Sequence, residues 1–303
     1  MSRTPSILRQ TLLATIAIAG VSFAFLSDDS TASNANDSPG TLVSANVGSG
    51  AALTGLGPAE ETKAKKPAKK IDPKLGIIEG RVVLNGKPPK FATKVAVPTG
   101  HADFAKCAKH VKDERLILGK ANGVKNAVVY VADVTAPKLD KMLPGKDYKL
   151  KGAKRARPMP NLTIDNKGCM FSPHVSAVTA GTKVAITNSD TFIHNTRGVL
   201  AASPLGNRAV AGKGKLPVVR LRKPGWGLVK CDYHSWMTAH VHVFDHECFD
   251  VSVSDGSFRI VNVPPGKYKL RVWHEELKNT EIEVTVEAGQ TAKTELNLAA
   301  YKE

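Results

Sequence analysis

Short β-type runs separated by turn residues fill the chain from about residue 77 onward, and this rhythm limits the fold more than any other feature. The clearest runs are Ile77 to Leu84, Val124 to Val131, Val175 to Val178, Lys183 to Asn188, Val218 to Leu221, Gly227 to Cys231 and Val241 to Phe244. Asn-Gly, Asp-Gly and Pro-Pro-Gly turns separate such runs, and helical periodicity is scarce. The pattern predicts an all-β protein of sandwich type, with one short helix near His101 to Val111.

The N-terminal segment has the features of an export signal. Arg3 and Arg9 precede an uncharged apolar run from Thr11 to Leu26, which ends before a polar stretch. We therefore predict a signal peptide or N-terminal anchor over 1–27 and a flexible linker rich in Ala, Ser and Lys over 28–73. The rest of the chain is expected in the periplasm or another extracytoplasmic space.

Positive charge is the main bulk property, with a net charge of +16 at pH 7. Part of it lies in two basic runs, at 63–70 and 149–157, which we interpret first as solvated linker and loop. Export argues against nucleic acid as a partner. If these runs do bind something, an acidic redox protein or an anionic envelope surface is the expected class.

The segment KCDYHSWM carries the chemistry. Cys231, His234 and Met237 are each three residues apart and follow a predicted strand, so one tight loop presents a thiolate, an imidazole and a thioether. Soft sulfur donors favour Cu(I), whereas imidazole suits Cu(II). His194 follows another predicted strand and supplies a second imidazole, and Asn195 beside it is expected to brace the ligand loop.

A His-Asn pair followed by a C-x2-H-x2-M loop resembles the cupredoxins, the type 1 blue copper proteins of the plastocyanin and amicyanin group. The resemblance covers about Pro160 to Asp245 and implies a Greek-key β-sandwich with one mononuclear copper. It implies that His194 and His234 are imidazole ligands, Cys231 the thiolate ligand and Met237 a weak axial ligand. Each of these residues taken alone is more often an ordinary core or surface residue.

Other histidines compete with this ligand set. His174 is the rival for the upstream ligand, but it precedes its strand and lacks an adjacent Asn. His240 and His242 alternate along one strand and so share a face, which is a spacing that a second copper or zinc ion can use. We expect instead that this face is solvated.

Three cysteines remain once Cys231 is assigned to metal. In an oxidising compartment one pair is expected, and we predict a disulfide between Cys107 and Cys169, with Cys248 unpaired. Around the ligand loop, Tyr233 and Trp236 have two interpretations, an apolar rim at the metal site or simple core packing.

The C-terminal segment Asp255 to Glu275, DGSFRIVNVPPGKYKLRVWHE, resembles the carboxypeptidase regulatory-like (transthyretin-like) β-sandwich modules. The segment Gly80 to Pro89 is similar to the opening strand of that module. We therefore predict a cupredoxin domain over 160–245 and a small sandwich over 246–300. A β region over 74–159 precedes them, and the hypothesis is that the copper domain is inserted after the first strand of the module.

These features predict a non-enzymatic carrier of single electrons between envelope redox partners such as a cytochrome or a dehydrogenase. The alternative is a copper-binding or carbohydrate-binding envelope module without an electron-transfer role. An enzyme ranks third, because it needs a second catalytic metal for which only His240 and His242 stand out.

Overall fold

The computed structural model describes residues 71–91, 95–134, 161–201 and 203–300. The predicted signal segment, all but the last three residues of the predicted linker and the basic run at 149–157 lie outside these ranges. Among the described residues, none of the helices has the length and apolar character needed to cross a membrane. The described residues are strands, turns and loops apart from α1 (Phe104–Cys107) and the 3-10 turn η1 (Lys120–Asn122). The predicted all-β class is confirmed.

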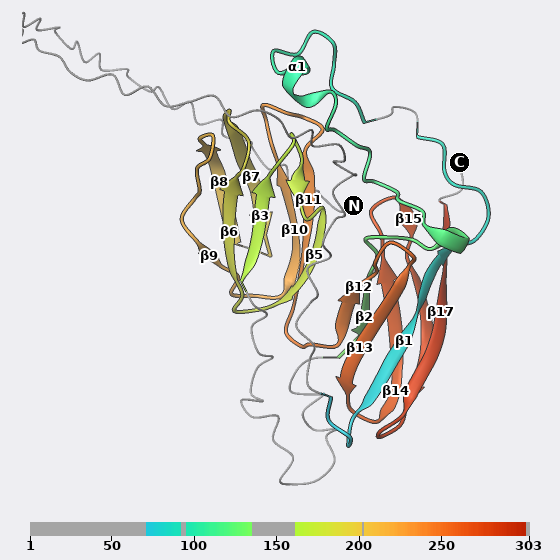
Figure 1. Ribbon diagram of the computed structural model, residues 1–303. Helices are drawn as coiled ribbons and strands as arrows, with labels where there is room; N and C mark the ends of the chain where they lie inside the picture. Colours follow the sequence, from blue (N-terminus) through green and yellow to red (C-terminus); the bar gives the residue numbers. More distant parts are fainter. Residues whose placement is uncertain (1–70, 92–94, 135–160, 202, 301–303) are drawn as a thin grey trace, which may run out of the picture. The chain divides into compact units, whose positions relative to one another are not determined.

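A central sandwich carries the predicted metal ligands and consists of two sheets, with strand orders β5-β11-β10-β7-β8 and β4-β3-β6-β9 (Figure 1). The first sheet contains β5 (Val175–Thr179), β7 (His194–Leu200), β8 (Ser203–Val210), β10 (Gly225–Lys230) and β11 (Thr238–Phe244). The second contains β3 (Leu162–Asn166), β4 (Phe171–Ser172), β6 (Lys183–Asn188) and β9 (Val219–Arg220). β5 pairs in parallel with β11 and β3 with β6, whereas the other pairs are antiparallel.

Alternation of apolar and polar residues explains why these two sheets pack face to face. In β6, Val184 and Ile186 are buried, and in β10 Val229 is buried between two exposed neighbours. Successive side chains of a strand point to opposite faces, so each strand contributes one apolar row to the interior. Cys231 and Met237 belong to the same core cluster as these residues. The ligand loop is therefore anchored on the apolar interior of the sandwich.

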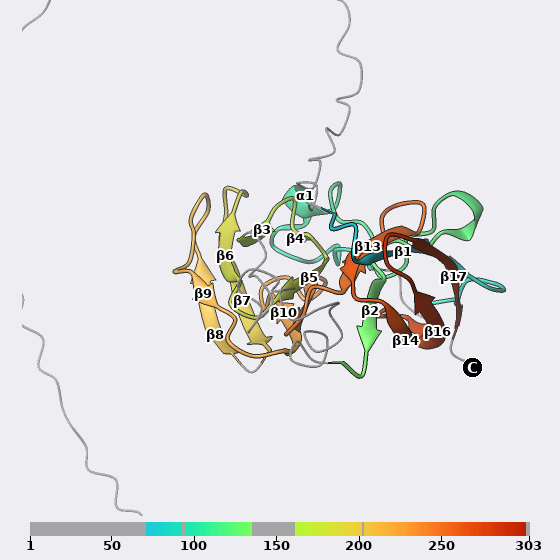
Figure 2. The same ribbon diagram turned by 90° about the horizontal axis from the view of Figure 1, so that it is seen from below.

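A second sandwich also has two sheets, with strand orders β13-β1-β17-β15 and β12-β2-β14-β16. The first sheet contains β1 (Gly76–Leu84), β13 (Ser257–Val263), β15 (Leu277–Lys278) and β17 (Thr291–Ala300). The second contains β2 (Val128–Ala132), β12 (Phe249–Val251), β14 (Gly266–Trp273) and β16 (Thr280–Val286). Figure 2 shows β1, β13 and β17 in one layer and β2, β14 and β16 in the other. A separate core of buried aliphatic and aromatic side chains fills the space between these layers.

β1 and β2 precede the central sandwich in the chain but pair with strands that follow it. Arg81 of β1 is opposite Ser257 of β13 on one side and opposite Glu295 of β17 on the other. β2 lies between β12 and β14. The strand at Arg81 to Leu84 thus pairs within the second sandwich, but two strands of that sandwich, and not only the first, precede the central sandwich, which lies between β2 and β12 in the chain.

The Asp255-Gly256 turn connects β1 to this second sandwich. Gly256 has φ +81°, and a Cβ at this position would lie 2.3 Å from the carbonyl oxygen of Val82. The carbonyl of Gly256 in turn accepts a hydrogen bond of 2.8 Å from the backbone N–H of Val82. Only glycine accommodates both the positive φ and this close approach of two backbones.

His240 and His242 share one face of β11, as the sequence predicts, but the expectation that this face is solvated is wrong. Both rings pack on Trp273 of β14, with ring centroids 5.2 Å and 4.3 Å apart, and His242 also contacts Trp226. His242 is 2% exposed, and burial lowers its pKa to about 3. The strand pattern gave no sign that an aromatic side chain from a distant segment covers this face.

Acid is expected to destabilise the protein through His242 and His246. Burial lowers the pKa of His246 to about 4, and its Nδ1 accepts a hydrogen bond from the backbone N–H of Cys248. Between pH 6.5 and 4 the unfolded chain binds protons that the folded chain does not, so the stabilisation from each neutral ring is present above pH 6.5 and is lost as the pH falls. A fall in pH from 7 to 5 should therefore lower the free energy of unfolding by about 2 kcal/mol for each of these two rings.

Urea unfolding of the wild type and of His242→Leu at pH 7 and pH 5 measures this effect. The variant should lose about half of the pH dependence that these two histidines produce, because Leu has no proton to bind. An unchanged pH dependence in the variant would contradict the assignment of His242 as a buried neutral ring.

Candidate metal centre

The predicted ligand loop is a tight turn between β10 and β11. Cys231 follows the last residue of β10, and Met237 directly precedes β11. The backbone N–H of Met237 donates to the carbonyl of His234 at 2.9 Å, and the N–H of Cys231 donates to the carbonyl of Met237 at 3.3 Å. These two bonds close the loop, so the spacing of three residues places all three side chains at one end of the sandwich.

His194 reaches the loop because it is the first residue of β7, which pairs with β10. Its Nδ1 lies 2.9 Å from Nδ1 of His234, and Sγ of Cys231 lies 3.6 Å from the same His234 atom. His194 and His234 are fully buried and Cys231 is 3% exposed. The structure thus brings together three of the four predicted ligands. Met237 is buried at the end of the same loop, and its role as an axial ligand stays a prediction.

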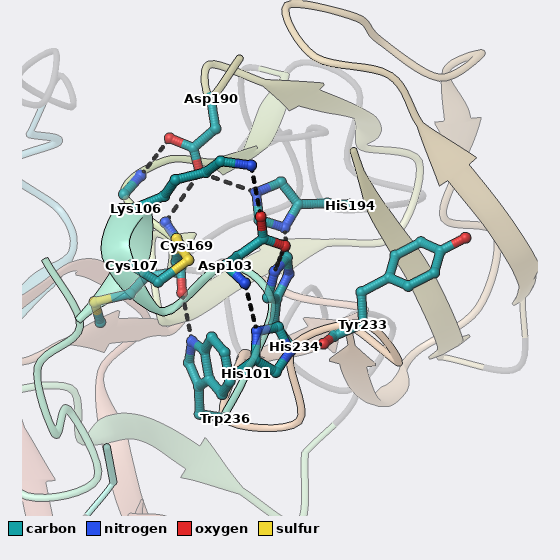
Figure 3. Close-up of a disulfide and its surroundings, with 12 residues drawn as sticks. His101, Asp103, Lys106, Cys107, Cys169, Asp190, His194, Tyr233, His234 and Trp236 are labelled. Carbon is teal, nitrogen blue, oxygen red and sulfur yellow. Dashed lines mark hydrogen bonds and ion pairs between the residues drawn. A yellow bond between two sulfur atoms is a disulfide. The ribbon is translucent and has the colours of Figure 1, made fainter. Parts of the chain in front are cut away.

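Two carboxylates set the orientation of both imidazoles. Nε2 of His194 lies 2.9 Å from a carboxylate oxygen of Asp190, and Nε2 of His234 lies 3.2 Å from one of Asp103 (Figure 3). With both Nε2–H groups donating to carboxylates, both Nδ1 lone pairs point at each other and toward the sulfur. Lone pairs facing each other at 2.9 Å repel unless a cation lies between them. Two nitrogens and a thiol around one point therefore fit a metal ion, and the outer carboxylates are typical partners of metal-bound histidine.

Burial controls the charge state of these groups. It lowers the pKa of His194 and of His234, although Asp190 and Asp103 act in the opposite direction. Burial also raises the pKa of the Cys231 thiol. For Asp190, burial alone would raise the pKa, but the backbone N–H groups of Cys169 and Gly168 and the ring of His194 together lower it. The result is a pair of neutral imidazoles beside ionised carboxylates, which suits cation binding.

Asn195 braces the ligand loop, as the sequence predicts. Its Oδ1 accepts hydrogen bonds from the backbone N–H groups of Asp232 at 2.5 Å and Tyr233 at 3.4 Å. Its Nδ2 donates to the carboxylate of Asp232 at 3.0 Å. β7 therefore positions the loop through Asn195 as well as contributing His194.

The two-sheet sandwich agrees with the fold that the resemblance implies. The histidine at the start of β7 and the Cys-x2-His turn before β11 agree with the ligand arrangement that it implies. The central sandwich is a cupredoxin-like domain.

Comparisons with known proteins give the following matches. Residues 246–294 match a family model described as polysaccharide lyase family 4, domain II. Among solved structures, a copper-containing nitrite reductase from Thermus scotoductus SA-01 is 23% identical with a TM-score of 0.26, and the match covers 29% of this chain and 23% of that one. An amicyanin mutant in its Cu(I) form is 14% identical with a TM-score of 0.25, covering 28% of this chain and 90% of that one. A purple cupredoxin from Nitrosopumilus maritimus is 21% identical with a TM-score of 0.24, covering 27% and 99%.

The chain spans less than a quarter of the length of the nitrite reductase that it matches. No protein of curated function matches the sequence.

A segment outside the cupredoxin-like domain covers His234. It includes α1 and carries His101 and Asp103, and the disulfide between Cys107 and Cys169 ties it to the loop that follows β3 (Figure 3). Nε2 of His101 lies 2.8 Å from the carbonyl oxygen of Tyr233, and the His101 ring lies 5.3 Å from that of His234. We call residues 98–111 the covering segment. The predicted disulfide is confirmed, and the predicted helix is reduced to one turn.

Trp236 and Tyr233 differ in position, although both flank His234 in sequence. Trp236 is partly buried and its Nε1–H donates to the carbonyl of Cys169 at 3.0 Å, so it packs the ligand loop against the disulfide. Tyr233 is 50% exposed. Trp236 thus packs the interior of the site, and Tyr233 lies on its outer side.

Sequence reasoning missed Asp103, Asp190 and His101. Asp190 stands only four residues before His194, so its proximity in the chain was available as a signal. Asp103 and His101 come from a segment more than 130 residues before His234, the ligand histidine that they reach, and no local pattern predicts that contact. His174, the rival ligand, lies in a different cluster with His240 and Glu275.

Proposed function

We propose that this protein is an exported type 1 copper protein that carries single electrons. The observation that carries the proposal is the convergence of two imidazole Nδ1 atoms and one thiol, with both Nε2 positions held by carboxylates. Copper, when bound, supplies a one-electron couple. The residues fix the donor atoms in advance, so that little has to move when the charge of the site changes.

The donor set favours copper over other ions. His194, Cys231 and His234 supply the strong donors and Met237 a weak thioether donor, and structural zinc has little use for a thioether. With all four ligands supplied by the protein, bound copper would have no open position for a substrate, which favours a carrier over an enzyme. Asp103 and Asp190 keep the two imidazoles oriented.

Location and partners follow from the sequence features. The N-terminal segment directs export to the periplasm or outer envelope, with or without retention as an anchor, and the Cys107–Cys169 disulfide suits an oxidising compartment. A cytochrome or a dehydrogenase serves as redox partner, and the positive net charge favours an acidic one.

The second candidate is a copper-binding or carbohydrate-binding envelope module without electron transfer. The match of residues 246–294 to a polysaccharide lyase domain favours it for the second sandwich. In that case copper is stored, delivered or structural.

A redox titration of the copper-loaded full chain, followed by visible absorption and EPR, separates the two candidates. A carrier should show an intense thiolate-to-copper band that bleaches and returns reversibly with one electron per chain, and should retain its copper in both states. Loss of copper on reduction, or a band that does not return, would overturn the carrier proposal in favour of storage or delivery.

A further inference from the structure

A second cluster of potential ligands lies apart from the first and combines three distant segments. His174 follows β4, His240 lies in β11 and Glu275 follows β14. One ligand atom from each of these residues lies within 4.8 Å of the other two. The side chains are 6%, 20% and 11% exposed respectively. Such low exposure is unusual for a carboxylate and two imidazoles without a shared counter-charge.

The ring of His174 is oriented by the backbone. Its Nδ1 lies 3.1 Å from the carbonyl oxygen of Thr238. Because a carbonyl oxygen can accept a hydrogen bond but cannot donate one, Nδ1 carries the proton. Nε2 of a neutral His174 then has a lone pair directed at Oε1 of Glu275, with which it is in close contact. Two acceptors in contact require a cation between them, either a proton or a metal ion. A backbone carbonyl on the far nitrogen is also a common arrangement for metal-bound histidine.

His240 completes the arrangement on the other carboxylate oxygen. Its Nε2 lies 3.1 Å from Oε2 of Glu275, and its ring packs on Trp273 with centroids 5.2 Å apart. The rings of His174 and His240 meet edge to face at 5.7 Å. All three groups are thus held in place by hydrogen bonds and packing before any ion binds, which reduces the entropic cost of coordination.

A cavity of about 340 Å³ borders the cluster. Its lining includes all three residues, and also Glu114, Trp236 and Met237. The cavity leaves space beside the cluster for water or another small ligand. Two imidazoles and one carboxylate form a donor set that, together with an open coordination position, is typical of zinc and related divalent ions.

We propose that His174, His240 and Glu275 form a second metal site, which binds a borderline divalent transition-metal ion such as Zn²⁺ and keeps an open position toward the cavity. The site is independent of the copper proposal, because it shares no ligand with it. The ion joins the cupredoxin-like domain to the loop after β14. Its ligands differ from the His240 and His242 pair that the sequence suggested, since His242 is enclosed by Trp226 and Trp273.

Zinc binding to the full chain in a Cys231→Ser background tests the proposal, because that substitution removes the thiolate of the first site. Calorimetric titration with Zn²⁺ and metal analysis after gel filtration should give one ion per chain bound at the second cluster and a higher melting temperature. Adding Glu275→Gln should weaken zinc binding by about 100-fold or more, beyond what the loss of an outer partner costs. Adding Glu283→Gln, a matched change on the exposed face of β16, should leave it unchanged.

The competing explanation is that a proton alone joins the three groups as a buried ion pair. Zinc binding that is absent, or that survives Glu275→Gln unchanged, would overturn the metal site. Circular dichroism of each variant checks that it is folded. If Glu275→Gln does not fold, His240→Gln replaces it, with the same loss of zinc expected and retained binding again overturning the site.

Discussion

Cys231→Ser is expected to abolish the visible band of the copper-loaded protein entirely. The band requires charge transfer from a thiolate, and Ser offers no comparable soft donor. Copper affinity should fall by more than about 100-fold, because a direct ligand matters more than the outer partners whose loss costs 10 to 100-fold. Visible absorption and EPR measure the loss of the thiolate ligand, and a copper titration against a competing chelator measures the loss of affinity.

Cys248→Ala is the matched control, because Cys248 is the other buried cysteine outside the disulfide and lies in the core of the second sandwich. It should keep the full band at some cost in stability. A band that persists in Cys231→Ser, or that disappears equally in Cys248→Ala, would show that Cys231 is not the thiolate ligand.

Removing the Cys107–Cys169 disulfide should lower the free energy of unfolding by about 4 kcal/mol. The cross-link joins residues 62 apart, and closing a loop of that length removes a corresponding amount of entropy from the unfolded chain. The double variant Cys107→Ala, Cys169→Ala measured by urea unfolding gives the value. The same variant should release copper faster to a chelator, because the covering segment loses its tie to the loop after β3.

Lys106→Ala serves as the control for this experiment. It changes an exposed residue of α1 and removes the ion pair with Asp103, yet it leaves the cross-link intact. Its free energy of unfolding should stay within about 0.5 kcal/mol of the wild type. A loss below about 1 kcal/mol in the double cysteine variant would mean that the covering segment is held mainly by its other contacts.

Local sequence patterns predicted the parts of the protein that depend on neighbours in the chain. The strand at Lys183–Asn188, the Asp255-Gly256 turn and the tight turn from Cys231 to Met237 all follow from alternation and turn chemistry. The disulfide was also predicted, as one of the three pairings open to the cysteines that remained once Cys231 was assigned.

Contacts between distant segments were not predictable in this way. The carboxylate of Asp103 reaches His234 across 131 positions, and Glu275 reaches His174 across 101. The sequence pattern of neither segment indicates its partner. The partner depends on which strands pair and on which loop covers the end of a sheet. The expectation that the face around His242 is solvated was wrong for the same reason, since Trp273 covers this face from another sheet.

In the proposed electron carrier, the covering segment has a consequence for the rate at which electrons leave the site. Electron tunnelling decays steeply with the distance between donor and acceptor, and His234 is fully buried beneath His101 and Asp103. A redox partner that exchanges electrons through His234 would therefore approach over this segment, whose surface carries the exposed Lys106 and Lys109. The thickness of this one short segment would then set the rate of electron exchange in the proposed carrier.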